Sequence, residues 1–308
     1  MNIAYRSYRN EYDYFQIRDF LCKTILLHDR RQINWPLYRW DYWRWHVNKN
    51  IFRFKLDESI FIWETDENAI AAVLNRSAPG EAFLQIHPRH RNMELVDEMV
   101  QVAEQRFTFE DEAGHSRLVI GVHESDTVLK TCLSARGFQR GDETEYQRWQ
   151  LLNQPILPAP IPDGYILRCL GETAELPARS WASWRVFHPN EPTENYKGWE
   201  WYLNVQRIPT YRRELDLVAV TPAGEVAAFV TIWYDEATRT GAFEPVGCMP
   251  EHQRKGLSKA LLTDGLRKLR ELGAAIAYVS SYTPAAHAAY ESVGFRDFEL
   301  CEMWVKES

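Results

Sequence analysis

The apolar residues of the chain recur with two periods, and these periods follow one another in an order that occurs twice. In the first half, the stretches 67–75 and 81–91 alternate between apolar and polar residues, an amphipathic run reaches Phe107, and an apolar stretch covers 117–124. Alternation is typical of strands, whereas apolar residues at i, i+3 and i+4 indicate helices. The pattern predicts the order strand, strand, helix, strand, short helix, strand.

The second half repeats this order. Strand-like stretches cover 224–232 and 241–254, an amphipathic run follows them, and an apolar stretch covers 274–281. A chain of 308 residues is longer than one core usually requires. Because an internal repeat of this length indicates copies of one unit, the sequence predicts two copies of one α/β fold.

A proline-rich segment separates the two repeats. Residues 152–164, LNQPILPAPIPDG, contain four prolines within eight positions. Proline fixes φ and offers no N–H group, so this segment is predicted to be an extended connector. We therefore expect a first domain at 1–151, a linker at 152–164 and a second domain at 165–308.

Two aromatic-rich segments, 37–46 and 195–204, precede the repeated strands and are predicted to be helical. Aromatic rings at helical spacing usually pack in a core, so no ligand is assigned to these segments.

Composition and charge restrict the classes of partner. The chain is 45% hydrophobic, and its net charge of -7 disfavours a nucleic-acid surface. The first residues contain no continuous apolar segment, and no apolar run reaches the roughly 18 residues of a membrane span, so we expect a cytoplasmic protein that does not bind membranes. The five cysteines are scattered without a CxxC pair, so neither disulfides nor a metal site is expected. Either a monomer or a homodimer is compatible with these properties.

Residues 250–262, PEHQRKGLSKALL, place basic residues directly before a glycine and a predicted helix start near Gly256. The first N–H groups of a helix lack intrahelical partners and attract anions, whereas cations are unfavourable there. Arg254 and Lys255 at this end therefore indicate a bound anion, although solvated surface charges are the alternative. Gly256 and Ser258 are small enough to admit a pyrophosphate.

Two motifs of the second half stand in a fixed order: PEHQRKGLS opens the predicted helix, and TPAAHAAYESVGF follows the next strand. Together they resemble the GNAT superfamily of N-acetyltransferases, in which the loop reads Q/R-x-x-G-x-G/A. Gln253, Gly256 and Ser258 fall on the fixed positions of that loop. Ser258 replaces the usual glycine or alanine, and Thr283 stands where many members have asparagine.

The resemblance implies two tandem GNAT folds, each an α/β (α+β) domain with a mixed, mostly antiparallel central sheet flanked by helices. It implies an N-acetyltransferase that moves acetyl from acetyl-CoA to a primary amine of a small molecule or peptide, by direct attack in a ternary complex and without a metal. The residues expected to bind acetyl-CoA lie at one strand end and in the following loop: Val246, Gly247, Cys248, Gln253, Arg254, Lys255, Gly256, Leu257 and Ser258.

Tyr290, in AAYESVGF, matches the tyrosine that commonly protonates the departing thiolate in the superfamily. A phenol is a competent proton donor at neutral pH, so this catalytic role is chemically sound. Packing in the core is the alternative role for Tyr290.

Glu244 is the candidate base that would remove the proton of the amine. Alternation predicts that it shares a strand face with Ala242 and Val246, and a carboxylate in an apolar strand requires an explanation. The alternative is a structural carboxylate that pairs with an arginine, such as Arg212 or Arg213. His188, in FHPNEP, is a weaker candidate for the same role.

The first half lacks both chemical positions. When the repeats are aligned on their shared proline, Glu94 falls on Gly256; when they are aligned on the later Gly-Phe pair, Leu133 falls on Tyr290. A glutamate would bring bulk and negative charge to the position of a pyrophosphate. The first domain is therefore expected to be a degenerate GNAT-like copy that does not bind CoA.

Two alternative functions are compatible with the same motifs. One is a non-catalytic regulatory module that binds CoA or a related metabolite. The other is an acyl or aminoacyl transferase of paired GNAT domains; a transfer RNA donor would require a broad basic surface, which a net charge of -7 disfavours.

Overall fold

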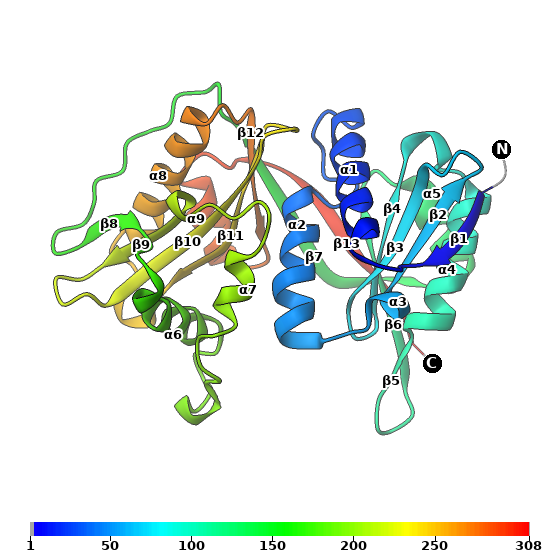
Figure 1. Cartoon of the computed structure of the whole chain (residues 1–308), viewed down its shortest axis with the longest axis horizontal. Helices are drawn as coiled ribbons and strands as arrows, with labels where there is room; N and C mark the ends of the chain where they lie inside the picture. Colours follow the sequence, from blue (N-terminus) through cyan, green and yellow to red (C-terminus); the bar gives the residue numbers. More distant parts are fainter. Residues whose placement is uncertain (1–2, 308) are drawn as a thin grey trace. The chain divides into compact units, whose positions relative to one another are not determined.

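The computed structural model describes residues 3–307, which form two compact units (Figure 1). Unit 1 contains the described residues of Met1–Gln147 and of Glu299–Ser308, and unit 2 contains Arg148–Phe298. Within residues 3–307, no helix has both the length and the hydropathy that crossing a bilayer requires.

Unit 1 is built on a sheet with the strand order β1-β2-β3-β4-β6-β13, in which the short β5 lies beside β6. Its strands are β1 (Ile3–Ser7), β2 (Ile60–Thr65), β3 (Ile70–Ala78), β4 (Glu81–Ile86), β5 (Phe109–Glu110), β6 (Ser116–His123) and β13 (Asp297–Glu307). Its helices are α1 (Glu11–Leu27), α2 (Leu37–Tyr42), the π-helical η1 (Trp43–Phe52), α3 (Leu56–Ser59), η2 (Pro88–His90), α4 (Met93–Phe107) and α5 (Thr127–Ala135).

Unit 2 is built on a sheet with the order β7-β12-β11-β10-β9-β8. Its strands are β7 (Gln139–Leu151, which begins in unit 1), β8 (Ile166–Cys169), β9 (Asp216–Val220), β10 (Val226–Asp235), β11 (Thr240–Cys248) and β12 (Ile276–Ser281). Its helices are η3 (Thr173–Glu175), α6 (Leu176–Phe187), η4 (Thr193–Asn195), α7 (Tyr202–Gln206), η5 (Arg213–Leu215), η6 (Pro250–His252), α8 (Leu257–Glu271) and α9 (Pro284–Glu291).

The two sheets share one arrangement of strand pairs. In each unit a run of antiparallel strands ends at a parallel pair, which is β4 beside β6 in unit 1 and β11 beside β12 in unit 2. Each parallel pair is short: its register joins Glu81–Phe83 to Val119–Gly121 in unit 1 and Thr240–Ala242 to Ile276–Tyr278 in unit 2. The predicted order of elements and the predicted mixed, mostly antiparallel sheets are confirmed.

One amphipathic helix packs on each sheet and accounts for the period detected in the sequence. In unit 2 this helix is α8, whose apolar face joins the buried residues of β10 and β11 in one core; its buried leucines are Leu257, Leu261, Leu262, Leu266 and Leu269. In unit 1, α4 occupies the same place between β4 and β6 in the chain and buries Val96, Met99, Val100 and Phe107. Burial of each such side chain stabilises the fold by roughly 1.5–3 kcal/mol.

The aromatic segments differ from one another. The first is helical and packs in the core, as predicted: Trp40 and Trp43 are buried, and their rings stack with centroids 5.5 Å apart. The second is interrupted, since η4 ends at Asn195 and α7 begins at Tyr202, and the helix predicted for all of 195–204 is wrong. Gly198 adopts a left-handed φ of 91°, which is incompatible with a continuous helix.

The last described strand, β13, follows unit 2 in the sequence, but from Glu299 onward it belongs to unit 1. β13 pairs antiparallel with β6, in a register that runs from Cys301 opposite His123 to Glu307 opposite Arg117. At the start of this pairing, the carboxylate of Glu299 lies 3.1 Å from Nε2 of His123. Residues 299–307 therefore complete the sheet of unit 1, an exchange that periodicity cannot reveal because it identifies strands without their partners.

Deletion of residues 299–308 should destabilise unit 1 more than unit 2, because β6 would lose the partner strand along its length and become an exposed edge. Hydrogen-exchange mass spectrometry should show faster exchange in β6 and little change in β10. Faster exchange in β10 with β6 unaffected would contradict this assignment of the strand.

Candidate active site

The strand that carries Glu244 contains a β-bulge. In the β10–β11 ladder, Val230 is opposite Val246 and Ile232 is opposite Phe243, so Thr231 alone faces both Glu244 and Pro245. A bulge shifts the alternation of side chains by one residue. The prediction that Ala242, Glu244 and Val246 share one face is therefore wrong: Phe243 and Val246 share the face that packs against α8.

The end of β11 has a free side toward β12. Beyond Ala242 the register of the parallel pair stops, whereas Val246–Cys248 remains paired with β10. Gly247 lies opposite Phe229, and a Cβ built on Gly247 would lie 2.2 Å from the ring of Phe229, so no larger residue fits there. This half-paired strand end is paired with β10 but not with β12. It contains Val246, Gly247 and Cys248, the strand residues that the sequence assigns to acetyl-CoA binding.

Tyr290 and Glu244 interact electrostatically. Tyr290 lies in α9, packs against the core of unit 2, and has its ring 6.4 Å from that of Phe295. Burial and, as a smaller cause, the negative charge of Glu244 together raise the pKa of Tyr290 to about 12. Tyr290 thus lies within the electrostatic influence of Glu244, the other residue that the sequence nominates for proton transfer, and combines partial packing with a protonated hydroxyl group.

The two arginines proposed as alternative partners of Glu244 bind other carboxylates. Arg212 pairs with Glu236, and Arg213 pairs with Glu172. The backbone carbonyl oxygen of Glu244 accepts a hydrogen bond of 2.6 Å from the indole of Trp233. Arg212 and Arg213, the two arginines named as examples of a structural partner, thus have other carboxylate partners.

In the described part of the chain, His188 contacts Trp184 and not Glu244 or Tyr290. Its ring stacks on Trp184 with centroids 5.7 Å apart, and its Nδ1 lies 3.1 Å from the carbonyl oxygen of the same residue. These contacts are those of a residue that packs at the end of α6.

In the loop between β11 and α8, no N-cap side chain caps the start of η6 or the start of α8. Neither Met249 before η6 nor Gly256 before α8 caps its helix through a side chain, and Gly256 has a left-handed φ of 87°. Arg254 also has a positive φ, of 60°, a conformation that is costly for a residue with a Cβ and that is concentrated at functional sites. The exposed N-terminus of α8 therefore offers N–H groups and nearby cations to an anion.

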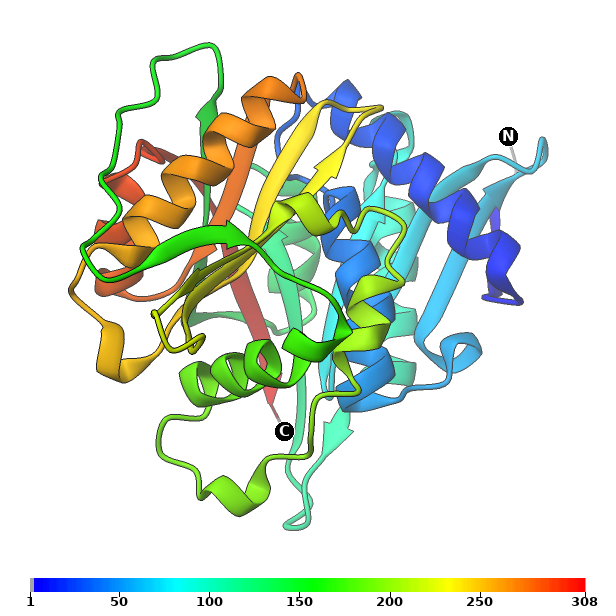
Figure 2. The ribbon, with the colours of Figure 1, turned by 60° about the vertical axis from the view of Figure 1, so that its left-hand side comes forward.

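Residues from the end of the proline-rich segment support this loop. Lys255 donates a hydrogen bond of 3.0 Å to the hydroxyl oxygen of Tyr165, and this oxygen lies 2.9 Å from Nδ1 of His252. His252 in turn lies 3.3 Å from Glu225. Figure 2 shows the green segment that precedes β8 passing beside the first turn of α8. Pro162, in this segment, lies close to Gly256. Sequence reasoning missed Tyr165, because nothing in the local pattern marks a contact with a loop so distant in the chain.

Gln253 also stabilises the loop, since its side-chain amide donates a hydrogen bond of 3.3 Å to the carbonyl oxygen of Cys248. Burial raises the pKa of the Cys248 thiol to about 11, although the charge of Lys255 opposes this shift. A thiol with such a pKa is protonated at neutral pH and is a poor nucleophile.

In the corresponding loop of unit 1, side chains cap the starts of η2 and α4. The His87 side chain accepts from the backbone N–H of Arg89, and the Asn92 side chain accepts from that of Leu95. The helix cap lies four positions after Pro88 in unit 1 and six positions after Pro250 in unit 2. Asn92 therefore takes the place of Gly256, and the alignment of Glu94 with Gly256 is wrong because the unit 1 loop is shorter.

In unit 1, the end of β4 forms hydrogen bonds with a side chain from another part of the chain. The side-chain amide of Asn34 donates to the carbonyl oxygen of Ile86 at 3.1 Å, and its Oδ1 accepts from the N–H of Ile86 at 3.0 Å. The N–H of Trp35 donates to the side chain of Gln85 at 2.7 Å. Asn34 thus satisfies both backbone groups of the last residue of β4, as a neighbouring strand would.

The sequence profile of the acetyltransferase (GNAT) family matches residues 176–295, which lie within unit 2 and contain Glu244, the uncapped loop and Tyr290. Unit 2 therefore contains a domain of the acetyltransferase (GNAT) family.

Two relatives extend this finding. The chain is 31% identical over 170 residues to the mycothiol acetyltransferase of Salinispora tropica, a match that covers 50% of this chain and 54% of that protein. It is 29% identical over 251 residues to the mycothiol acetyltransferase of Paenarthrobacter aurescens, with 75% of this chain and 71% of that protein covered. The match thus spans about half of the length of the first relative.

Two solved structures share the fold along nearly the whole chain. A GCN5-related N-acetyltransferase from Sphaerobacter thermophilus superposes with a TM-score of 0.67 at 16% identity, and covers 99% of this chain and 95% of its own. A tandem GNAT protein from the clavulanic acid biosynthesis pathway gives the same TM-score of 0.67 at 14% identity, with 99% and 98% covered. The predicted architecture of tandem GNAT folds is confirmed at the level of fold.

Replacement of Glu244 by Gln should lower the pKa of Tyr290, because the carboxylate charge that disfavours the phenolate would be removed. Burial remains, so the pKa should stay above that of a free phenol. NMR titration of Cζ-labelled tyrosine, assigned with Tyr290→Phe, measures this shift. An unchanged Tyr290 titration in Glu244→Gln would show that the two side chains do not interact.

Proposed function

We propose that unit 2 transfers the acetyl group of acetyl-CoA to a primary amine of a small molecule or peptide, by direct attack within a ternary complex. The observation that carries this proposal is the half-paired end of β11, which lies in a domain of the GNAT family together with Glu244 and Tyr290. A base and an acid in a domain with such a strand end suit a reaction that removes one proton and supplies another.

The loop of unit 2 suits the pyrophosphate of acetyl-CoA. The N–H groups at the start of α8 have no side-chain cap, and Arg254 and Lys255 add positive charge to that end of the helix. The free side of Val246–Cys248 offers backbone groups to the extended pantetheine arm, apart from the Cys248 carbonyl oxygen, which accepts from Gln253. Gln253, Leu257 and Ser258 complete the proposed binding residues.

The side chains of unit 2 account for the movement of protons. Glu244 accepts the proton of the incoming ammonium group, so that the neutral amine can attack. The amine nitrogen forms a bond to the acetyl carbon while the carbon–sulfur bond breaks, and the electron pair of that bond leaves with sulfur. Tyr290, whose pKa of about 12 keeps it protonated, donates its proton to the sulfur, and the second proton that the nitrogen loses as the amide forms returns to the Tyr290 oxygen. Bound acetyl-CoA supplies an acyl carbon that is activated toward amines.

Unit 1 is proposed to be a degenerate copy that binds no acetyl-CoA. Asn92 caps the helix at which a pyrophosphate would bind, and Asn34 occupies the backbone groups at which a pantetheine arm would pair. Leu133, fully buried, stands in place of Tyr290. The domain limits 1–151, 152–164 and 165–308 describe the two sequence repeats, with β13 exchanged in the fold.

The relatives suggest where to look for the acceptor. Because two matched proteins are named mycothiol acetyltransferases, the amine that those enzymes acetylate is one candidate to test alongside simple amines and peptides.

Gly256→Asp should weaken acetyl-CoA binding more strongly than Gly256→Asn. Both residues tolerate a positive φ, but only aspartate brings negative charge to the proposed pyrophosphate site. We expect calorimetry of the full chain to give one site, and a difference between the variants of about tenfold, or ~1.4 kcal/mol. Equal affinities would contradict the loop assignment, and a second site would contradict the proposal for unit 1.

Tyr290→Phe should reduce kcat roughly 100-fold or more while changing acetyl-CoA affinity little, because the hydroxyl group is required for proton donation rather than for binding. Release of free thiol with a panel of amines measures turnover, and calorimetry measures affinity. Wild-type protein that binds acetyl-CoA without turning over any amine would favour the non-catalytic module instead.

A further inference from the structure

The bulge that carries Glu244 is held by a side chain from the neighbouring strand. Trp233 is 1% exposed, and its indole Nε1 donates a hydrogen bond of 2.6 Å to the carbonyl oxygen of Glu244. Residues at a bulge lose regular ladder partners, and Pro245, directly after Glu244, has no N–H to contribute. The indole therefore satisfies a backbone group that the bulge removes from the ladder.

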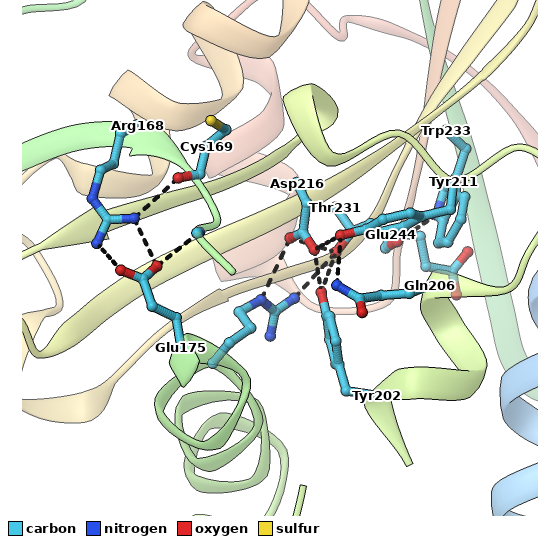
Figure 3. Close-up of polar contacts among 12 residues, drawn as sticks. Arg168, Cys169, Glu175, Tyr202, Gln206, Tyr211, Asp216, Thr231, Trp233 and Glu244 are labelled. Atoms are coloured by element: carbon cyan, nitrogen blue, oxygen red, sulfur yellow. Dashed lines mark hydrogen bonds and ion pairs between the residues drawn. The ribbon is translucent and has the colours of Figure 1, made fainter. Parts of the chain in front are cut away.

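The ring of Trp233 is itself held in place by Tyr211. The two ring centroids are 6.3 Å apart, and the hydroxyl group of Tyr211 donates to Oδ2 of Asp216 at 3.0 Å. Gln206, at the end of α7, donates to the same hydroxyl oxygen at 3.3 Å. Figure 3 shows Tyr211 between Asp216 and Trp233, on the side of Asp216 where Glu244 lies.

Asp216 is the centre of this group. It is fully buried, accepts a hydrogen bond of 2.6 Å from Tyr202, and lies 3.6 Å from Nε of Arg179. Burial raises the pKa values of Tyr202 and Tyr211, which keeps both hydroxyl groups protonated as donors. The carboxylate therefore holds two tyrosines and one arginine in fixed positions.

Asp216 is also connected, through Arg179 and Phe229, to the strand end proposed to bind pantetheine. The guanidinium group of Arg179 stacks 3.8 Å from the ring centroid of Phe229, and the tip of that ring fills the space above Gly247. The Asp216 group thus contacts both the bulge and the segment that follows it.

We propose that Trp233 is a positioning residue for Glu244, and that Tyr211 and Asp216 hold Trp233 in the orientation that this requires. The inference rests on the proposed function, because it gives Glu244 the role of base. It adds a residue that touches neither the amine nor acetyl-CoA, and that acts by fixing the backbone from which the base projects.

Trp233→Phe tests the proposal in the full chain, since phenylalanine retains a ring beside Tyr211 but has no N–H donor. We expect kcat to fall about 3- to 10-fold, the range for one lost hydrogen bond, while KM for acetyl-CoA is unchanged. In a Glu244→Gln background the same substitution should have no further effect, because the group that Trp233 positions is already inactive. An equal loss in both backgrounds would overturn the proposal.

Trp63→Phe is the matched control. Trp63 is fully buried in unit 1, and its indole N–H has no hydrogen-bond partner among the described residues. This substitution removes the same volume and no hydrogen bond, so kcat should be unchanged. A loss of kcat equal to that of Trp233→Phe would show a general effect of core volume and would overturn the proposal.

Hydrogen exchange separates this inference from the proposed function, because it requires no turnover. Trp233→Phe should increase exchange in the peptide 240–248, whereas Trp63→Phe should not. If the wild-type protein acetylates no amine, the proposed function fails, and the exchange result still decides whether Trp233 fixes the bulge. Unchanged exchange in Trp233→Phe would overturn the positioning role.

Discussion

The strands β11 and β12 run side by side for three positions and then separate, and the site depends on this early end of a parallel pair. Backbone N–H and C=O groups inside a protein require partners. When a strand keeps one neighbour and loses the other, its free side must be satisfied by a ligand, by water or by another part of the chain. The separation thus leaves a strand end that an extended molecule could pair with, and the bulge at Glu244 lies next to this end.

Unit 1 shows the other solution to the same constraint. Its parallel pair also ends after three positions, but Asn34 satisfies the last residue of β4 and Asn92 caps the helix that follows. The sheet, the amphipathic helix and the order of elements are retained, while the loops differ. Binding residues are commonly carried by loops on a retained scaffold, and here a few side chains in such loops account for the difference between the two units.

Much of the architecture could be predicted from the sequence, because it follows from local patterns. Apolar periods predicted the repeated order of elements, and the basic residues before Gly256 indicated the uncapped start of α8. The face assigned to Glu244 was wrong, since an extra residue in one strand leaves no mark in that strand's own alternation. The alignment of Glu94 failed for a similar reason, because a shorter loop changes which residue caps the helix.

Features that depend on contacts between distant residues could not be predicted. Trp233 and Asp216 read as ordinary members of buried strands, and their role becomes visible only when the hydrogen bonds to Glu244 and Tyr211 are known. Tyr165 likewise meets Lys255 across a long stretch of chain. These contacts join segments whose separate sequences carry no motif, so the shape of the proposed site is less predictable than its chemistry.

The placement of β13 in the sheet of unit 1 has a consequence for the biosynthesis of the protein. Residues 299–307 leave the ribosome only after all of unit 2 has been made, which at 5–20 residues per second is a delay of roughly 10 to 30 s. During that interval β6 lacks the partner it has in the finished protein, so a nascent chain exposes a strand that can pair with other polypeptides. The two halves cannot mature one after the other as independent domains, and a gene divided at the proline-rich segment would encode a first product that is incomplete.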